Sequence, residues 1–160
     1  MSRDTGFHAE ADPSEVVDEI LPILKIHARE LDAEISVKLE TGGRVCCDRV
    51  QIQQVVLNLV RNAMDAPPTG ERRRVLISGA RAETGYRIIV EDNGPGVSDT
   101  VAPHLFEPLS STKAGGMGLG LTICRTIIEA HDGVIQLAPS SLGGAAFAFT
   151  LNNRKTDAQG

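Results

Sequence analysis

The chain has 160 residues, of which 41% are hydrophobic and 3% aromatic, so it suits one compact domain with a core of Val, Ile, Leu and Ala. Its formal net charge of −5 leaves no broad cationic surface, and nucleic acid is therefore not an expected partner. No run approaches the about 20 apolar residues that a bilayer-spanning helix needs, and the N-terminus has no apolar signal-peptide region. We therefore expect a cytoplasmic domain without direct membrane insertion.

The cysteines and the single basic run do not indicate a disulfide framework, a zinc site or a functional cationic patch. Cys46, Cys47 and Cys124 are odd in number and form no CxxC pair, so we expect free, buried thiols in place of disulfides or a structural zinc site. The one basic run, at 72–74, lies in a turn-like stretch, and we predict that it is a solvated loop.

In chain order, the apolar spacing predicts three helices. Asp12 followed by Pro13 starts the first helix, which continues to residue 31. Asp48 caps the second helix, whose apolar stripe runs over 49–64, and the third covers 121–130. Strands are predicted at 35–39, 44–47, 75–80, 86–91, 134–137 and 145–151.

This order of elements predicts an α/β (α+β) two-layer sandwich, in which about three helices cover one face of a mixed, mostly antiparallel sheet. We expect the domain over 12–151, after a flexible lead-in at 1–11 and before a polar tail at 152–160. The Gly- and Pro-rich stretch at 92–120 is long for a domain of this size, because most connections have only about 4–6 residues. We expect it to be a functional loop.

Two asparagines of the second predicted helix form the first candidate site. Asn58 and Asn62 are four residues apart, so their amides share one helix face. Asn is a poor helix former, and amide oxygens are suitable ligands for Mg²⁺ together with phosphate oxygens and water. Taken alone, the same spacing would also suit two exposed or capping amides.

A second motif, Asp-Asn-Gly-Pro-Gly at 92–96, follows a predicted apolar strand directly. The two glycines allow the backbone to approach a ligand closely. An ionised Asp92 can only accept hydrogen bonds, so it suits an exocyclic amine such as that of adenine. An ordinary Asp-Asn-Gly turn would have the same sequence.

A third motif, at 111–120, contains four glycines and runs into the last predicted helix. Converging backbone N–H groups and a helix N-terminus favour phosphate, and Lys113 adds a full positive charge. The pattern is neither a P-loop nor a dinucleotide-binding fingerprint, because no strand leads into it and no Gly-Lys-Ser/Thr follows it. A flexible glycine linker is the alternative interpretation.

In this order, the three motifs resemble those of the GHKL ATPases, a superfamily of gyrase, Hsp90, MutL and histidine kinases. The resemblance covers the kinase N box, G1 box, F box, G2 box and last glycine motif, at 54–63, 92–96, 105–108, 116–121 and 143–147. The F box, and Asn at position 58 where the ATPases have Glu, point to sensor histidine kinases. The Phe-Glu-Pro-Leu-Ser-Ser-Thr-Lys lid resembles that of the nitrogen-regulating and oxygen-sensing FixL-type kinases.

The resemblance implies the Bergerat fold, ATP and Mg²⁺ as cofactors, and an ATP lid at about 97–117. It implies that Asn58 and Asn62 hold Mg²⁺ and that Lys113 contacts the terminal phosphates; these three would be the catalytic residues. It also implies that Asp92 reads adenine and that Phe106 anchors the lid or meets a partner domain. Further nucleotide contacts are implied for Gly94, Gly96, Val97, Leu105, Gly116, Gly118, Leu119, Gly120 and Phe149. No contact carries over to Asp65 and Ala66, where many kinases have Lys and Tyr.

The implied activity is that of an ATP-dependent protein-histidine kinase domain, which donates the γ-phosphoryl group of ATP to a histidine on a separate dimerisation and phosphoacceptor hairpin. A response regulator would act downstream, and the parent kinase could be membrane-anchored. Of the four histidines only His131 precedes an acidic residue, and we interpret it as structural. The chain is therefore expected to be a monomeric donor half, inactive alone. A nucleotide-gated interaction module without turnover and an anti-sigma-type Ser/Thr kinase of the same fold are the alternatives.

Overall fold

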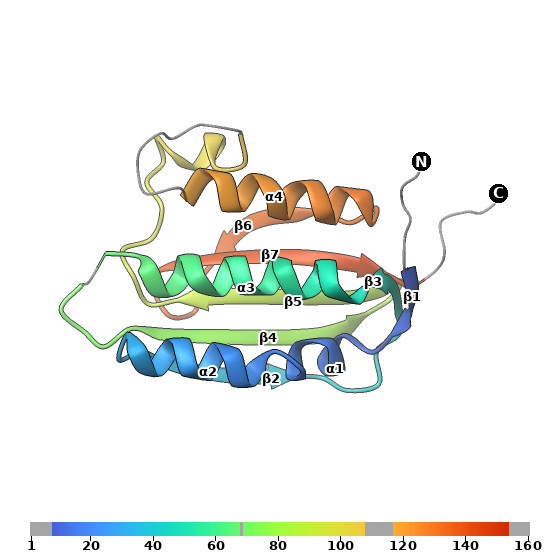
Figure 1. Cartoon of the computed structure of the whole chain (residues 1–160). Helices are drawn as coiled ribbons and strands as arrows, with labels where there is room; N and C mark the ends of the chain where they lie inside the picture. Colours follow the sequence, from blue (N-terminus) through green and yellow to red (C-terminus); the bar gives the residue numbers. More distant parts are fainter. Residues whose placement is uncertain (1–7, 68, 108–116, 154–160) are drawn as a thin grey trace.

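The computed structural model describes residues 8–67, 69–107 and 117–153. A five-stranded sheet forms one layer, in the order β2 (Glu34–Leu39), β4 (Arg74–Ala82), β5 (Gly85–Asp92), β7 (Ala145–Asn152) and β6 (Ile135–Pro139). β2 is parallel to β4, and the other neighbours are antiparallel. The helices form the second layer on one face of the sheet (Figure 1), which confirms the predicted fold class.

The helical layer is built around one central helix. α3 (Arg49–Asp65) packs against β5 and is flanked by α4 (Met117–Ala130) on one side and by α2 (Leu21–Glu30) on the other (Figure 1). Among the described residues, no helix combines the length and the apolar character needed to cross a membrane. The predicted stripe of α3 is buried: Ile52, Val55, Val56, Leu59, Val60, Ala63 and Met64.

Both predicted helix caps are confirmed. The side chain of Asp12 accepts a hydrogen bond from the N–H of Ser14 at 3.0 Å, at the start of α1 (Pro13–Asp18). The side chain of Asp48 accepts one from the N–H of Gln51 at 3.2 Å, at the start of α3. Each carboxylate satisfies one of the N–H groups that a helix N-terminus leaves unpaired.

The first predicted helix is in fact two, because the chain bends between α1 and α2. Pro22 lies in the first turn of α2. Proline has no N–H to donate, and in a continuous helix its ring would clash with the carbonyl group of Asp18. The chain therefore ends one helix and starts another at this point.

The predicted lead-in is wrong for its last four residues. His8–Ala11 form strand β1, which pairs antiparallel with β3 (Val45–Asp48) in a separate two-stranded sheet. The side chains of β1 are largely exposed, so no apolar alternation marks the strand in the sequence. It forms through backbone pairing with a distant segment, and the ring of His8 stacks on that of His131 at 4.4 Å.

α4 begins at Met117, four residues before the predicted start. Gly118 and Gly120 lie in its first turns, and glycine disfavours helix, so the sequence pattern alone places the start too late. The predicted tail also starts too early, since β7 continues to Asn152.

His131 connects the end of α4 to the start of α3, which confirms its structural role. Its Nδ1–H donates to the carbonyl oxygen of Ile127 at 2.8 Å, and its Nε2 accepts from the N–H of Asp48 at 3.0 Å. Because a carbonyl can only accept and an amide N–H can only donate, this arrangement requires the neutral imidazole. Burial lowers the pKa of His131 below its ordinary value.

The stability of the fold should therefore fall in mild acid. The unfolded chain takes up a proton on this histidine from about pH 6.5 downward, whereas the folded chain resists it, so the free energy of unfolding declines below that pH and is steady above it. Urea unfolding across this range measures the decline. His131→Gln should reduce the pH slope, and a matched change at the exposed His104 should not; equal slopes in wild type and His131→Gln would contradict the assignment.

Candidate functional site

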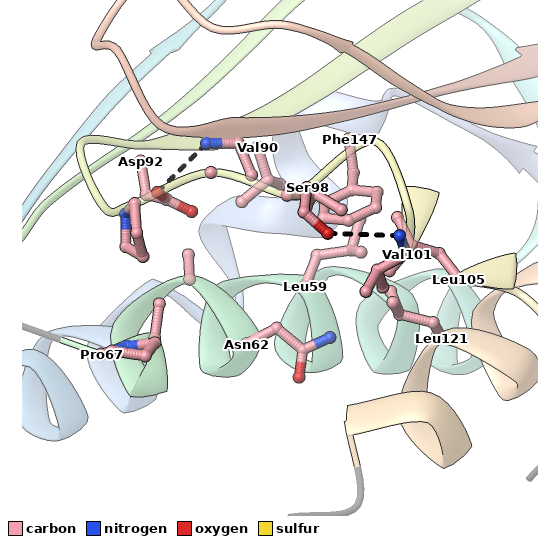
Figure 2. Close-up of a pocket in the computed structure, with 16 residues that line it drawn as sticks. Leu59, Asn62, Pro67, Val90, Asp92, Ser98, Val101, Leu105, Leu121 and Phe147 are labelled. Carbon is pink, nitrogen blue, oxygen red and sulfur yellow. Dashed lines mark hydrogen bonds between the residues drawn. The ribbon is translucent and has the colours of Figure 1, made fainter. Parts of the chain in front are cut away.

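A cavity of about 180 Å³ opens where α3, the end of β5 and the loop after β5 meet (Figure 2). Its walls are largely apolar, and Asp92 is the one ionisable residue among the described residues that line it. The lining residues are Leu59, Asn62, Ala63, Ala66, Pro67, Val90, Asp92, Pro95, Gly96, Val97, Ser98, Val101, Leu105, Leu121, Ala145 and Phe147. An apolar cavity with few polar groups is the usual form of a small-molecule site.

Asp92 is a buried carboxylate, 5% exposed, at the last position of β5. Its Oδ1 accepts hydrogen bonds from the N–H groups of Gly94 at 2.7 Å and Ala145 at 3.3 Å. Within the described part of the chain no hydrogen bond reaches Oδ2, and the side chain points from β5 toward α3 (Figure 2). Burial raises the pKa of Asp92, and the two N–H groups work against that shift.

The turn between β6 and β7 packs directly behind Asp92. The N–H of Gly144 donates to the main-chain oxygen of Asp92 at 3.0 Å, and the hydroxyl of Ser140 donates to the same oxygen at 3.1 Å. A Cβ on Gly144 would lie 2.3 Å from Asp92 Oδ1 and 2.5 Å from the nitrogen of Gly94. Only glycine fits there, which gives the last glycine motif a physical role.

The side-chain amide of Asn93, the residue after Asp92, pairs with the main chain of the neighbouring strand. Its Oδ1 accepts from the N–H of Arg74 at 2.8 Å, and its Nδ2 donates to the carbonyl oxygen of Arg72 at 3.0 Å. The amide thus extends the pairing of β4 with β5 by one residue. The Asp-Asn-Gly sequence is therefore more than an ordinary turn, since it ends a strand with the carboxylate fixed at the cavity.

The two asparagines of α3 do not face the same site. Asn62 lines the cavity, and its Nδ2 is buried without a hydrogen-bond partner among the described residues. Asn58 is absent from the lining; its amide interacts with the Cys124 thiol, and this works against the burial that raises the thiol's pKa to about 12. The structure thus places only Asn62 at the cavity, and the prediction that both amides hold one ion stays a prediction.

Residues 47–155 match the family described as histidine kinase-, DNA gyrase B-, and HSP90-like ATPases. The chain belongs to this ATPase family. The matched part contains α3, Asp92 and the glycine turn behind it, so the cavity lies wholly within the family domain.

Relatives of this ATPase domain are sensor kinases. The chain is 44% identical to the C4-dicarboxylate transport sensor protein DctS of Rhodobacter capsulatus over 158 residues, covering 94% of the chain and 23% of DctS. It is 40% identical to the sensor protein FixL of Bradyrhizobium diazoefficiens over 140 residues, covering 86% of the chain and 28% of FixL. The chain thus spans about a quarter of the length of these relatives.

Solved structures agree with this family. The catalytic domain of histidine kinase ThkA superposes with a TM-score of 0.83 at 31% identity, covering 92% of this chain and 97% of that domain. Full-length ShkA in complex with AMPPNP gives a TM-score of 0.78 at 25% identity, covering 94% of this chain and 32% of ShkA.

The residues predicted as apolar walls of a nucleotide site lie in different places in the structure. Val97 and Leu105 line the cavity, whereas Phe149 does not and is fully buried in the core. Phe147 lines the cavity instead. Both phenylalanines lie on the same face of β7, but Phe149 is two residues, or about 7 Å, farther along the strand. The alternation of residues in β7 identified the face of the strand that meets the cavity, but it did not show which end of β7 lies at the cavity.

Several predicted contacts lie in or next to the glycine-rich stretch. Lys113 and Gly116 fall outside the described residues, as does the side chain of Leu119. Gly118 and Gly120 belong to α4. Gly96 lines the cavity with a positive φ of +82°, a conformation that favours glycine, and Gly94 donates to Asp92.

Phe106 anchors the described part of the loop that follows β5. Its ring meets that of Phe147 edge to face, with centroids 6.0 Å apart and an interplanar angle of 87°. Its carbonyl oxygen accepts from the hydroxyl of Thr122 at 3.4 Å. Phe106 therefore joins the loop to both the cavity wall and α4.

The basic run is only partly the solvated loop that we predicted. Arg72 and Arg74 are exposed, but Arg73 is buried, and its Nη2 donates to the carbonyl oxygens of Ala66, at 2.7 Å, and Pro67. Nothing in the local sequence distinguishes the middle arginine, because its partners lie in the segment that follows α3.

Gly144→Ala should destabilise this ATPase domain, because the added methyl group would overlap the Asp92 carboxylate and the Gly94 backbone. We expect a loss of about 1–3 kcal/mol in the free energy of unfolding, as for other overpacked sites. Gly120→Ala is a matched control, since its Cβ would meet no described atom within 4 Å and alanine favours helix. Chemical denaturation compares them; equal stabilities would contradict the steric argument.

Proposed function

We propose that this chain binds Mg²⁺ and ATP and donates the γ-phosphoryl group to a histidine on a separate dimerisation and phosphoacceptor hairpin. The buried carboxylate of Asp92, with Oδ2 available at an apolar cavity, carries the proposal. A flat base with an exocyclic amine suits this cavity, because the amine can donate to Oδ2 while apolar side chains such as Leu105 and Phe147 contact the ring. The likeness to the ThkA catalytic domain and to ShkA, solved with AMPPNP, supports this choice of ligand.

Asn62 is the residue that we assign to Mg²⁺. Its amide is buried at the cavity with Nδ2 unpaired among the described residues, and a buried polar group without a partner costs stability. A half-turn of the amide would present its oxygen, a suitable Mg²⁺ ligand. When bound, the ion neutralises charge on the phosphates. Asn58 contacts Cys124 and is not part of this proposed metal site.

The phosphates are assigned to the glycine-rich stretch before and within α4. Gly118 and Gly120 belong to the first turns of this helix, whose unpaired N–H groups favour an anion. By the family resemblance, Lys113 contacts the terminal phosphates and Gly116 contributes to the phosphate cradle. These groups would orient the γ-phosphoryl group for attack.

In the proposed reaction, a ring nitrogen of the acceptor histidine attacks the γ-phosphorus in line. The new N–P bond forms as the bond to the bridging oxygen breaks, ADP leaves with that electron pair, and a base on the acceptor domain takes up the proton of the imidazole. Positioning and electrostatics supply most of the catalysis in such transfers. Asn58 stands where the hydrolytic relatives have a glutamate, and an amide does not take up a proton near neutral pH, which favours transfer over hydrolysis.

The wider setting is proposed from the relatives. DctS and FixL are sensor proteins several times longer than this chain. We propose that the domain acts in the cytoplasm as a monomeric donor, with a response regulator downstream.

ATP binding should depend on both Asp92 and Mg²⁺. Asp92→Ala removes a hydrogen bond to a charged group, typically about 1.5–3 kcal/mol, so we expect affinity for ATP to fall by about 10- to 100-fold. Omitting Mg²⁺ should weaken ATP binding to the wild type as well. Calorimetric titration with and without Mg²⁺ measures both effects; an unchanged affinity in Asp92→Ala would disprove the adenine assignment.

Phosphotransfer should require the acceptor hairpin. Alone, the chain should bind ATP without labelling itself; mixed with a cognate hairpin and γ-labelled ATP, it should label the hairpin on histidine. Phosphohistidine is acid-labile, whereas a hydroxyl phosphoester is acid-stable, so acid treatment distinguishes a histidine kinase from an anti-sigma-type Ser/Thr kinase. Confirmed ATP binding with no label on any hairpin would instead favour a nucleotide-gated module without turnover.

A further inference from the structure

Arg73 is a buried cation beside the cavity that the proposed chemistry does not use. It is 8% exposed, although arginine is rarely buried without partners. Its Nη2 is paired with two carbonyl oxygens, but within the described residues Nε and Nη1 have no hydrogen-bond partner. A buried positive charge with unpaired donors lowers stability unless a nearby group offsets it.

The unpaired Nη1 faces Gly94 and the carboxylate of Asp92. A Cβ built on Gly94 would lie 2.4 Å from Nη1 and 3.0 Å from Asp92 Oδ1, so these two atoms are separated by no more than the two distances together, 5.4 Å. Opposite charges this close in a buried setting attract strongly. Burial raises the pKa of Asp92, and the positive charge of Arg73 works against that shift.

The other end of the guanidinium group holds a wall of the cavity. The two carbonyl groups that accept from Nη2 belong to Ala66 and Pro67, and both residues line the cavity. These residues follow the end of α3, whereas Arg73 immediately precedes β4. One side chain thus connects the wall beyond α3 to the loop that carries Gly94.

We propose that Arg73 is a positioning residue for recognition of the adenine amine. It fixes the wall formed by Ala66 and Pro67 relative to Asp92, and its positive charge beside Asp92 favours the form of the carboxylate that accepts a hydrogen bond. This inference rests on the proposed role of Asp92. Arg73 acts through that residue, since it does not itself line the cavity.

Two nucleotides separate this role from a general structural one: ATP, and purine riboside triphosphate, which lacks the 6-amino group. With Mg²⁺ present, wild type should prefer ATP. Arg73→Met keeps a long side chain without the charge. Loss of the contacts to the wall should weaken the binding of both nucleotides, and loss of the charge should weaken ATP about tenfold more than the analogue. Arg73→Lys retains the charge and should keep more of the preference for ATP.

Arg72→Met is the matched control. Arg72 is exposed, and its Nε donates to the carbonyl oxygen of Asp32 at 3.3 Å, so this variant should discriminate as wild type does. Equal losses for both nucleotides in Arg73→Met, an unchanged preference there, or a lysine variant no better than methionine would each overturn the proposal. A wild type without preference for ATP would overturn the Asp92 assignment itself, and this proposal with it.

Discussion

The carboxylate of Asp92 accepts hydrogen bonds from the N–H groups of Gly94 and Ala145, and the cavity is arranged around this buried anion. Its position is a property of the sheet. β5 and β7 pair in a register that sets Glu91 opposite Ala146, so the turn preceding β7 must pass directly behind Asp92. Glycine at 144 permits that approach, and the main-chain oxygen of Asp92 anchors the turn. Within the described residues Oδ2 accepts no hydrogen bond, and the side chain points toward α3 (Figure 2).

Features that depend on neighbours in the chain could be predicted from the sequence. The caps at Asp12 and Asp48 and the buried stripe of α3 follow from local hydrogen bonding and from helical spacing. The end of β5 was predictable to within one residue, at Glu91 for an observed end at Asp92, because an apolar strand stops there and glycines follow. Since these elements leave few arrangements of one sheet and its helices, the fold class was predictable too.

Features that depend on distant segments could not be predicted in this way. β1 has largely exposed side chains and exists through its pairing with β3. Arg73 is buried because the carbonyl groups of Ala66 and Pro67 receive it, and its two arginine neighbours have identical chemistry. The choice of Phe147 over Phe149 as a cavity residue depends on where along β7 the cavity opens. Each of these outcomes is decided by packing between elements, about which local patterns carry no information.

The chemistry possible at the cavity also depends on which of its lining side chains can take up a proton or accept a hydrogen bond. Among the described lining residues Asp92 alone is ionisable, and its Oδ1 is committed to two N–H groups of the scaffold. A carboxylate held in this way can accept a hydrogen bond from a donor in the cavity through Oδ2. Asn62 adds an amide to the cavity, which can bind an ion but cannot act as a base. In the proposed reaction these groups hold and orient the phosphoryl donor, and the nucleophile comes from the acceptor hairpin.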